Sequence, residues 1–189
     1  MNIAIIYGSV RNNRQGIKAA RFIEKKLKKK EYKTTLIDPL EIEIPLLHKV
    51  YKEYEADNAP ENLKKIHQIL KEADGFVIVS AEYNHTPPPA LINIIDHFLP
   101  EFLYKPSGIV TYSAGPFGGV RSLHTLRSLM AEVGAPSIPT AFPISKVQDA
   151  FDEEGNAIEK AYNERVEKFL KEFDWYLNAL KNHRQTNPM

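Results

Sequence analysis

The feature that most constrains this chain is an alternation of short, continuous apolar runs with longer amphipathic segments. Residues 75–79 form the clearest apolar run, and residues 3–7 form another. Runs of this kind are typical of strands that are buried on both faces, as in a parallel sheet. Between them, residues 15–30 carry apolar side chains on one helical face and charged side chains on the other, with Glu24 and Lys28 spaced to form an ion pair.

The same alternation continues to the end of the chain. Further strands are predicted at residues 34–37, at 109–112 and between 137 and 142, and further helices from Pro60 to about 70, at 90–98, at 118–133 and at 158–180. Residues 39–59 show neither pattern and are expected to form a long loop with a charged segment at 51–57, and loops of this length are often functional. Strand and helix repeated about five times predict an α/β protein with a doubly wound, five-stranded parallel sheet and helices on both faces. We expect a single domain over residues 1–182 and a polar C-terminal tail, 183–189, that frays.

The amino-acid composition excludes several classes of protein. The 189 residues include no cysteine, which excludes disulfides, thiolate metal sites and cysteine nucleophiles. The formal net charge is +1, so neither a basic excess for nucleic acid nor an acidic excess for docking on basic electron-transfer partners is present. The N-terminus does not resemble a signal peptide and no apolar run is long enough to span a membrane. We therefore expect a cytoplasmic protein that binds neither nucleic acid nor membrane.

The loop at residues 8–16 has the chemistry of an anion site. In an open parallel sheet, ligands bind beyond the carboxyl ends of the strands, where the strand order reverses. This loop offers the Ser9 hydroxyl, the guanidinium groups of Arg11 and Arg14, and the N–H groups of a helix N-terminus, all of which favour anions. Two arginines would balance a phosphomonoester of roughly −1.5 to −2 charge. The alternative is an ordinary polar turn with solvated arginines, and the loop is neither a Walker A motif nor a glycine-rich dinucleotide fingerprint.

Two further loops are expected at the same edge of the sheet. In residues 81–89, Asn84 can donate to and accept from the edge of a planar heterocycle, and Tyr83 can supply a flat surface. The alternative is a proline-stiffened turn that caps the next helix. In residues 113–119, glycines let the backbone approach a ligand closely, although a flexible connection has the same composition. Together the loops predict a phosphate at one end of a site and a planar ring at the other, which is the shape of FMN.

At these residues the chain resembles the NADPH-dependent FMN reductase family of flavodoxin-like proteins. Its phosphate loop is similar to residues 8–16, its flavin loop and following helix to residues 82–84 and 90–96, and its glycine loop to residues 115–121. The resemblance covers about residues 2–140. Two positions depart from the family pattern, because Ala81 stands where proline is frequent and Ile92 where lysine is frequent.

The resemblance implies a set of cofactor-binding residues. The residues that would hold the phosphate are Ser9, Arg11, Arg14, Gln15 and Gly16. Those that would line the flavin ring are Glu82, Tyr83, Asn84 and His85. Those that would close the other side are Ser113, Gly115, Gly118 and Gly119.

The activity implied by the resemblance is an oxidoreductase of the NAD(P)H-dependent FMN reductase or quinone reductase type. FMN would be bound tightly but non-covalently, and NADPH or NADH would deliver hydride to it in a ping-pong reaction. A quinone, azo compound, free flavin or metal oxyanion would then take the electrons. Because the flavin carries the chemistry, no catalytic side chain is assigned. His85 is either a proton relay or only a polar wall, and the other histidines lack the spacing of metal ligands, so no metal site is predicted.

The helix at 90–99 bears on assembly. Its apolar residues surround most of the circumference, so it must be buried on more than one side. The family implies a homodimer, or a dimer of dimers, in which the partner covers the flavin. Two alternatives stay open: an FMN-binding electron carrier, and a redox-sensing or scaffold protein without efficient turnover. The physiological acceptor and the choice between NADPH and NADH are not predicted.

Overall fold

Five parallel strands form one sheet in the computed structural model, which describes residues 1–55 and 58–188. The strands are β1 (Asn2–Tyr7), β2 (Lys33–Ile37), β3 (Gly75–Ala81), β4 (Ser107–Tyr112) and β5 (Phe142–Ile144). Their order across the sheet is β2-β1-β3-β4-β5, and every neighbouring pair is parallel. This is the order of flavodoxin-like doubly wound sheets, in which the direction of winding reverses between β1 and β3. The predicted fold class is therefore confirmed.

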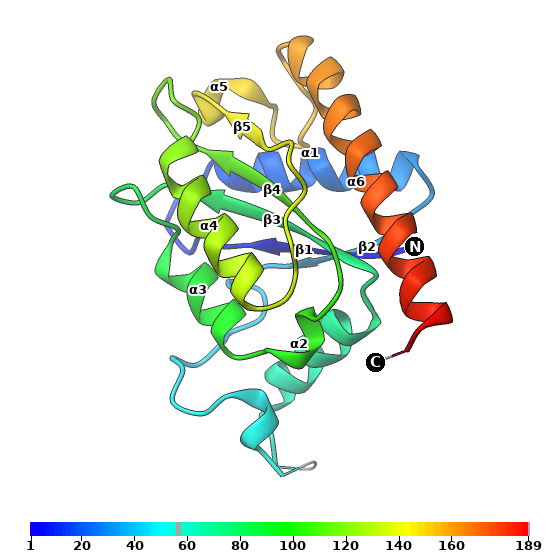
Figure 1. Ribbon diagram of the computed structural model, residues 1–189. Helices are drawn as coiled ribbons and strands as arrows, with labels where there is room; N and C mark the ends of the chain where they lie inside the picture. Colours follow the sequence, from blue (N-terminus) through cyan, green and yellow to red (C-terminus); the bar gives the residue numbers. More distant parts are fainter. Residues whose placement is uncertain (56–57, 189) are drawn as a thin grey trace.

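Helices cover both faces of the sheet (Figure 1). One face carries α1 (Gly16–Lys29), the short α5 (Val147–Ala150) and the long α6 (Ala161–Thr186). The other carries α2 (Glu61–Glu72), α3 (Pro89–Asp96) and α4 (Val120–Glu132). Every residue of β3 is buried between these two layers, as its continuous apolar sequence predicts. Each large aliphatic side chain buried there stabilises the fold by roughly 1.5–3 kcal/mol.

The parallel register brings the carboxyl ends of the central strands together. Tyr7 at the end of β1 pairs with Val79 of β3, and Ala81 at the end of β3 pairs with Tyr112 at the end of β4. The three loops that follow these strands therefore leave the same edge of the sheet, on the left of Figure 1. The sequence predicted this meeting of the loops correctly.

The fifth strand begins later than predicted. Ser137 makes only an isolated bridge to Ser107, and the chain then leaves the sheet at Pro139, which has no N–H to donate. It returns at Phe142, which pairs with Val110 of β4. The prediction of a strand between 137 and 142 was therefore wrong in position, and α5 was not predicted at all.

The last helix is longer than predicted, because α6 continues to Thr186 instead of ending at 180. Lys181 forms an ion pair of 2.9 Å with Asp74, and Arg184 donates to the carbonyl oxygens of Tyr104 and Asp74. These contacts hold against the body of the protein a segment that was predicted to fray. Residue 189 of the predicted tail lies outside the described residues.

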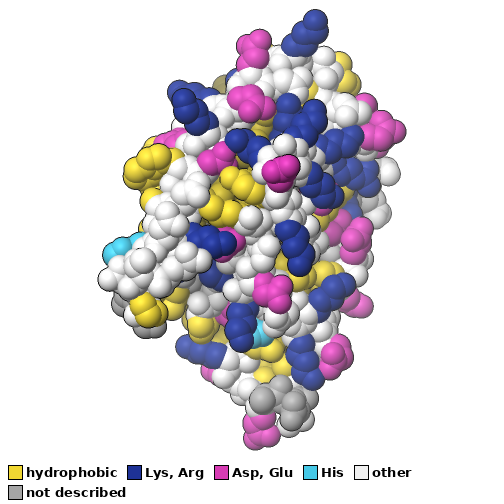
Figure 2. All heavy atoms as spheres, turned by 90° about the vertical axis from the view of Figure 1, so that its right-hand side faces the viewer, with side chains coloured by type: hydrophobic (Ala, Val, Ile, Leu, Met, Phe, Trp, Pro, Cys, Tyr) yellow, Lys and Arg dark blue, Asp and Glu magenta, His cyan; other side chains and the backbone are white. Residues whose placement is uncertain are grey.

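Some surface ion pairs join neighbouring turns of one helix, and others join distant parts of the chain. Basic and acidic side chains are interspersed over the face that carries α6 (Figure 2), where Lys30 and Tyr32 both contact Asp174. The predicted Glu24–Lys28 pair is present, with a nitrogen–oxygen distance of 2.8 Å. Among the described residues, no helix is apolar and long enough to cross a membrane.

The long segment after β2 lies against α2 and α3. It contains a single turn of 3-10 helix, Tyr51–Glu53, and the Tyr51 ring stacks on His67 with 4.3 Å between ring centroids. Asn93 of α3 accepts from the N–H of Leu47 and donates to the carbonyl oxygen of Pro45. A second 3-10 turn, Pro100–Phe102, follows α3. Residues 56 and 57 of the predicted charged segment lie outside the described residues.

Candidate functional site

A cavity of about 280 Å³ opens at the carboxyl ends of β1, β3 and β4. Its wall includes predicted site residues from all three loops: Arg11, Arg14, Gln15, Gly16, Glu82, Tyr83 and Ser113. It also includes residues that were not predicted: Asn12, Asn13, Ala81, Tyr112, Ala114, Val147 and Gln148. A larger hollow of about 450 Å³ lies against α1, but four of its lining residues are lysines and it contains no residue of the three loops.

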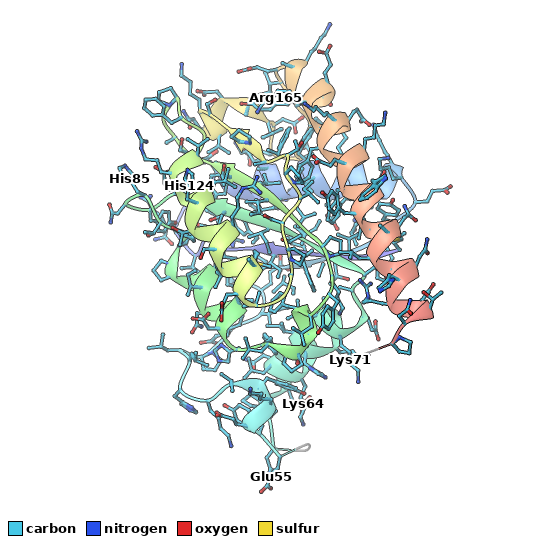
Figure 3. The ribbon with its side chains drawn as sticks, viewed as in Figure 1. Glu55, Lys64, Lys71, His85, His124 and Arg165 are labelled. Carbon is cyan, nitrogen blue, oxygen red and sulfur yellow. The ribbon has the colours of Figure 1, made fainter. Side chains whose placement is uncertain are left out.

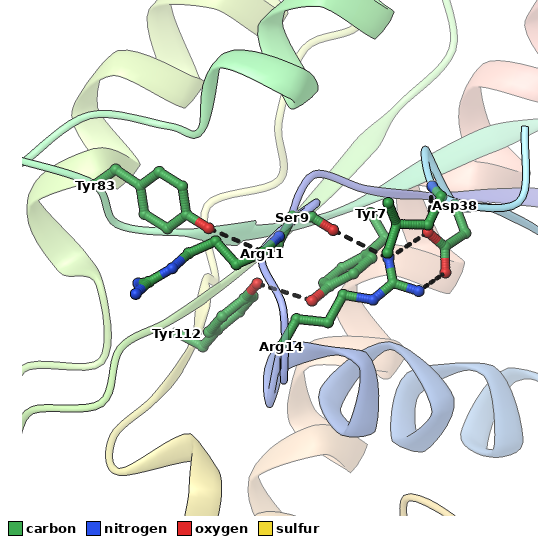
Figure 4. Close-up of polar contacts among 8 residues, drawn as sticks. Tyr7, Ser9, Arg11, Arg14, Asp38, Tyr83 and Tyr112 are labelled. Carbon is green, nitrogen blue, oxygen red and sulfur yellow. Dashed lines mark hydrogen bonds and ion pairs between the residues drawn. The ribbon is translucent and has the colours of Figure 1, made fainter. Parts of the chain in front are cut away.

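The first two loops are joined through Ser9. This serine is 3% exposed, and its hydroxyl is 2.9 Å from the hydroxyl of Tyr83 (Figure 4). The N–H of Arg11 also points to the Ser9 hydroxyl, at 3.4 Å. The exposed Arg11 side chain lies over the Tyr83 ring, with 5.7 Å from the guanidinium carbon to the ring centroid. Ser9 is thus part of the structure that supports the cavity wall.

Arg14 is held by a buried carboxylate. Its two terminal nitrogens each donate to one oxygen of Asp38 at 2.5 Å, and one of them also donates to the carbonyl oxygen of Ser9. The Asp38 side chain is 1% exposed. Although burial alone lowers the pKa of Arg14, the hydrogen bonds and charge of Asp38 outweigh it and raise that pKa. The charge of Arg14 is therefore already balanced by Asp38. The sequence-based expectation that both arginines balance the phosphate charge did not take this ion pair into account.

Two buried tyrosines lie at the site, of which Tyr112 belongs to the cavity wall. Tyr7 and Tyr112 stack with 6.4 Å between ring centroids, and the Tyr112 hydroxyl donates to the Tyr7 hydroxyl at 3.3 Å. Burial raises the pKa of both tyrosines above the ordinary value, that of Tyr112 strongly. A Cβ at position 16 would overlap the Tyr112 ring, which is why only glycine fits there. The ring thereby packs directly against the first residue of α1.

The N-terminus of α1 is free to bind an anion. No side chain caps it, and its first turn contains no acidic residue. The first N–H groups of a helix have no partner within the helix and carry partial positive charge. Gln15 and Gly16 at this terminus line the cavity together with Arg11. This donor set fits the phosphate end of FMN.

The second loop forms a tight turn that extends away from the cavity. The backbone groups of Tyr83 and Thr86 pair across it, and Asn84 and His85 have φ of +50° and +67°. Two consecutive left-handed residues are typical of a two-residue hairpin turn, and asparagine tolerates that conformation well. Both side chains are exposed, and His85 lies at the outer edge of the molecule (Figure 3). Neither belongs to the cavity wall in this chain.

Glu82 reaches the cavity wall but also caps a helix. One of its carboxylate oxygens accepts from the N–H groups of Arg121 and Ser122, at 2.9 and 3.3 Å. These are among the first N–H groups of α4, where a negative charge is stabilising. Glu82 therefore joins the second loop to the helix that follows the third.

The third loop is held against β4 by its glycines. The Thr111 hydroxyl donates to the carbonyl oxygen of Gly118, and both Gly118 and Gly119 have positive φ. A Cβ at Gly119 would lie 2.8 Å from the carbonyl oxygen of Tyr112. These two glycines shape the loop and do not line the cavity. Gly115 does not line it either, and has open space around it.

Sequence comparison relates the chain to known reductases. The model of the NADPH-dependent FMN reductase family matches residues 1–149. The chain is 26% identical over 191 residues to a quinone reductase of Pseudomonas putida, covering 97% of this chain and 96% of the relative. It is 29% identical over 140 residues to an NADPH azoreductase of Bacillus sp. (strain OY1-2), covering 74% of each.

Structure comparison supports the same fold. FerB, a flavoenzyme NAD(P)H:(acceptor) oxidoreductase from Paracoccus denitrificans, superposes with a TM-score of 0.72 at 19% identity, covering 96% of this chain and 98% of FerB. The fold follows from this likeness, and the family follows from the sequence match over residues 1–149. The chain therefore belongs to the NADPH-dependent FMN reductase family and is an FMN-dependent NAD(P)H oxidoreductase.

Proposed function

We propose that this oxidoreductase passes electrons from NAD(P)H through FMN to a small acceptor: a quinone, an azo compound, a free flavin or a metal oxyanion. The observation that carries the proposal is the cavity that joins the uncapped N-terminus of α1 and Arg11 to the aromatic side chains of Tyr83 and Tyr112. It offers an anion site and flat surfaces within one wall. The relatives named quinone reductase and azoreductase support the choice of acceptors.

The proposed cofactor contacts follow the three loops. We assign the phosphate to Ser9, Arg11, Arg14, Gln15 and Gly16, which are gathered around the N-terminus of α1. We assign the ring to Glu82, Tyr83, Asn84 and His85 on one side and to Ser113, Gly115, Gly118 and Gly119 on the other. Of these, Glu82, Tyr83 and Ser113 line the cavity, and the others lie outside its wall. When bound, FMN supplies the redox chemistry that side chains lack. The chain's own part is to bind the phosphate and orient the ring, and Tyr112, whose pKa is raised by burial, offers a neutral aromatic side chain to the cavity.

We propose that the ring end of the site is completed by a second copy of the chain, in a homodimer or a dimer of dimers. The cavity of about 280 Å³ is slightly smaller than the range of roughly 300–1,000 Å³ for small-molecule sites. Beside the turn at 83–86 lies an apolar groove of about 400 Å³, lined in part by Leu46, Pro87 and Ile92. Leu46 is 84% exposed, and Leu99, which lies between α3 and the following 3-10 turn, is 39% exposed. Exposed apolar patches of this kind are typical of protein interfaces.

Sedimentation measures this assembly directly. We expect a dimer or tetramer at micromolar concentration, and a shift toward monomer when Leu46 is replaced by Glu. A monomeric wild-type chain under these conditions would refute the proposed dimer.

We also propose that the chain works in the cytoplasm and without nucleic acid or membrane partners, since NAD(P)H is supplied there. Cell fractionation followed by immunoblotting tests this location. Recovery of the protein with the membrane pellet would contradict it.

Steady-state kinetics tests the catalytic proposal. The purified chain, loaded with FMN, is mixed with NADPH or NADH and with each acceptor class in turn. We expect multiple turnovers with at least one acceptor. The alternative of an electron carrier or redox sensor predicts only slow oxidation of the reduced nicotinamide with every small acceptor.

A further inference from the structure

Asp38 lies next to the proposed phosphate loop although it follows a different strand. It follows β2 directly, and β2 pairs with β1, so the two strands end at the same edge of the sheet. Its side chain is almost fully buried. Both carboxylate oxygens accept from Arg14, and one also accepts from the N–H of Leu40. A buried carboxylate with this set of donors holds its partner in a fixed position.

Arg14 connects Asp38 to the backbone of the loop. A guanidinium has five N–H donors in a rigid plane. Two of those on Arg14 bind Asp38, and a third binds the carbonyl oxygen of Ser9. The same guanidinium lies over the Tyr7 ring, 5.2 Å from its centroid (Figure 4). Asp38 is thus connected through one planar group to the backbone at the start of the phosphate loop.

The two arginines of this loop differ in their ion-pair partners. Arg14 is neutralised by Asp38, whereas Arg11 has no carboxylate partner in the described part of the chain. A free carboxylate near a phosphate would repel it. Removing the negative charge of Asp38 should therefore strengthen phosphate binding if charge alone matters, and weaken it if the position of Arg14 matters.

We infer that Asp38 is a positioning residue for the phosphate loop: it acts through Arg14 to fix the loop backbone, while Arg11 supplies the net positive charge. This inference rests on the proposed binding of FMN in the cavity. It adds to the cofactor-binding residues a position that makes no contact with the ligand, and it assigns separate tasks to Arg11 and Arg14.

The test is a double-mutant cycle in cofactor affinity. The dissociation constants of FMN and riboflavin are measured by quenching of flavin fluorescence on apoprotein of the wild type, Asp38→Asn, Arg14→Gln and the double variant. We expect Asp38→Asn to weaken FMN binding about tenfold or more and to leave riboflavin binding nearly unchanged, because only FMN has the phosphate. In the Arg14→Gln background, Asp38→Asn should add no further loss.

Controls separate this role from a loss of folding. Asp174→Asn removes another ion-paired aspartate, which belongs to α6 and contacts Lys30 instead of the phosphate loop, and should leave both affinities unchanged. If a single variant does not fold, the double variant, which leaves neither charge unpaired, still reports whether the FMN preference is lost. Tighter or unchanged FMN binding in Asp38→Asn, or an equal loss for riboflavin, would overturn the inference. A wild-type chain that does not bind FMN would instead overturn the proposed function.

Discussion

The loop at 8–16 and the turn at 83–86 follow neighbouring strands, yet they differ in how firmly their side chains are held by the rest of the protein. The loop has a buried serine, an ion pair with the buried Asp38 and a glycine that fits under Tyr112. The turn pairs its own backbone and is tied to the loop through the Tyr83 hydroxyl, but its Asn84 and His85 side chains are exposed. The phosphate end of the proposed site is therefore built within one chain, whereas the ring end is open.

This difference has a physical meaning for binding. Donors that are fixed before the ligand arrives lose little freedom on binding, so a rigid phosphate site adds affinity at low entropic cost. An open ring end leaves room for a nicotinamide, an acceptor and a second subunit to reach the flavin in turn. The contrast between a rigid and an open end can be tested at both ends.

The largest effect is expected where the rigid end is packed most closely. In Gly16→Ala the added methyl group overlaps the Tyr112 ring, so one of the two must move. We expect a loss of about 1–3 kcal/mol in the free energy of unfolding, together with a marked loss of FMN affinity. Denaturant unfolding and flavin titration measure both. Gly115→Ala is the matched control for stability, since a Cβ there meets no atom within 4 Å, and the free energy of unfolding should be unchanged. Equal free energies of unfolding for the two variants would mean that the loop is not tightly packed.

The second effect concerns the buried tyrosines under the loop. Burial raises the pKa of Tyr112 well above 10, its ordinary value. Below pH 10 the folded and unfolded chains both keep the proton, and above it only the folded chain does. The free energy of unfolding should therefore fall as pH rises above 10, by up to about 1.4 kcal/mol per pH unit for this group. Tyr112→Phe should fall less steeply between pH 9 and 11 in denaturant unfolding. Parallel curves for the two proteins would contradict a buried, neutral Tyr112.

The smallest effect is expected at the open end. His85→Asn keeps a residue that accepts the left-handed backbone, and the side chain is exposed. We expect the free energy of unfolding to change by less than about 0.5 kcal/mol. Any loss of affinity should be about equal for FMN and riboflavin, because the two share the ring. A selective loss of FMN in this variant would place the phosphate at the turn and reverse the comparison.

The sequence predicted the fold better than the details of the site. Continuous apolar runs such as β3 mark buried strands clearly, and the order of strands then places the loops at one edge. The position of β5 was missed because the strand has only three residues and one of them is Pro143. The predicted start at Ser137 corresponds in the structure to a single isolated bridge with Ser107. The end of α6 depends on the contact of Arg184 with Tyr104, which periodicity does not contain.

Three of the residues missed in and around the site lie at the ends of strands. Tyr7 and Tyr112 are the last residues of β1 and β4, and Asp38 is the first residue after β2. The rule that ligands bind at the carboxyl ends of strands was applied to the loops but not to these positions, although it would have identified all three. The two roles of Arg11 and Arg14 were not predictable in this way, because they depend on which guanidinium reaches Asp38.

The central claim is that the loop at 8–16 binds the phosphate of FMN, and Arg11 tests it most directly. Its guanidinium is exposed beside the cavity and has no carboxylate partner in the described residues. The measurement is the ratio of FMN to riboflavin affinity in the wild type and in Arg11→Ala, by flavin titration of the apoprotein. We predict that the substitution weakens FMN binding about 10- to 100-fold while riboflavin binding stays nearly constant. Equal losses for the two flavins would show that the phosphate is bound elsewhere.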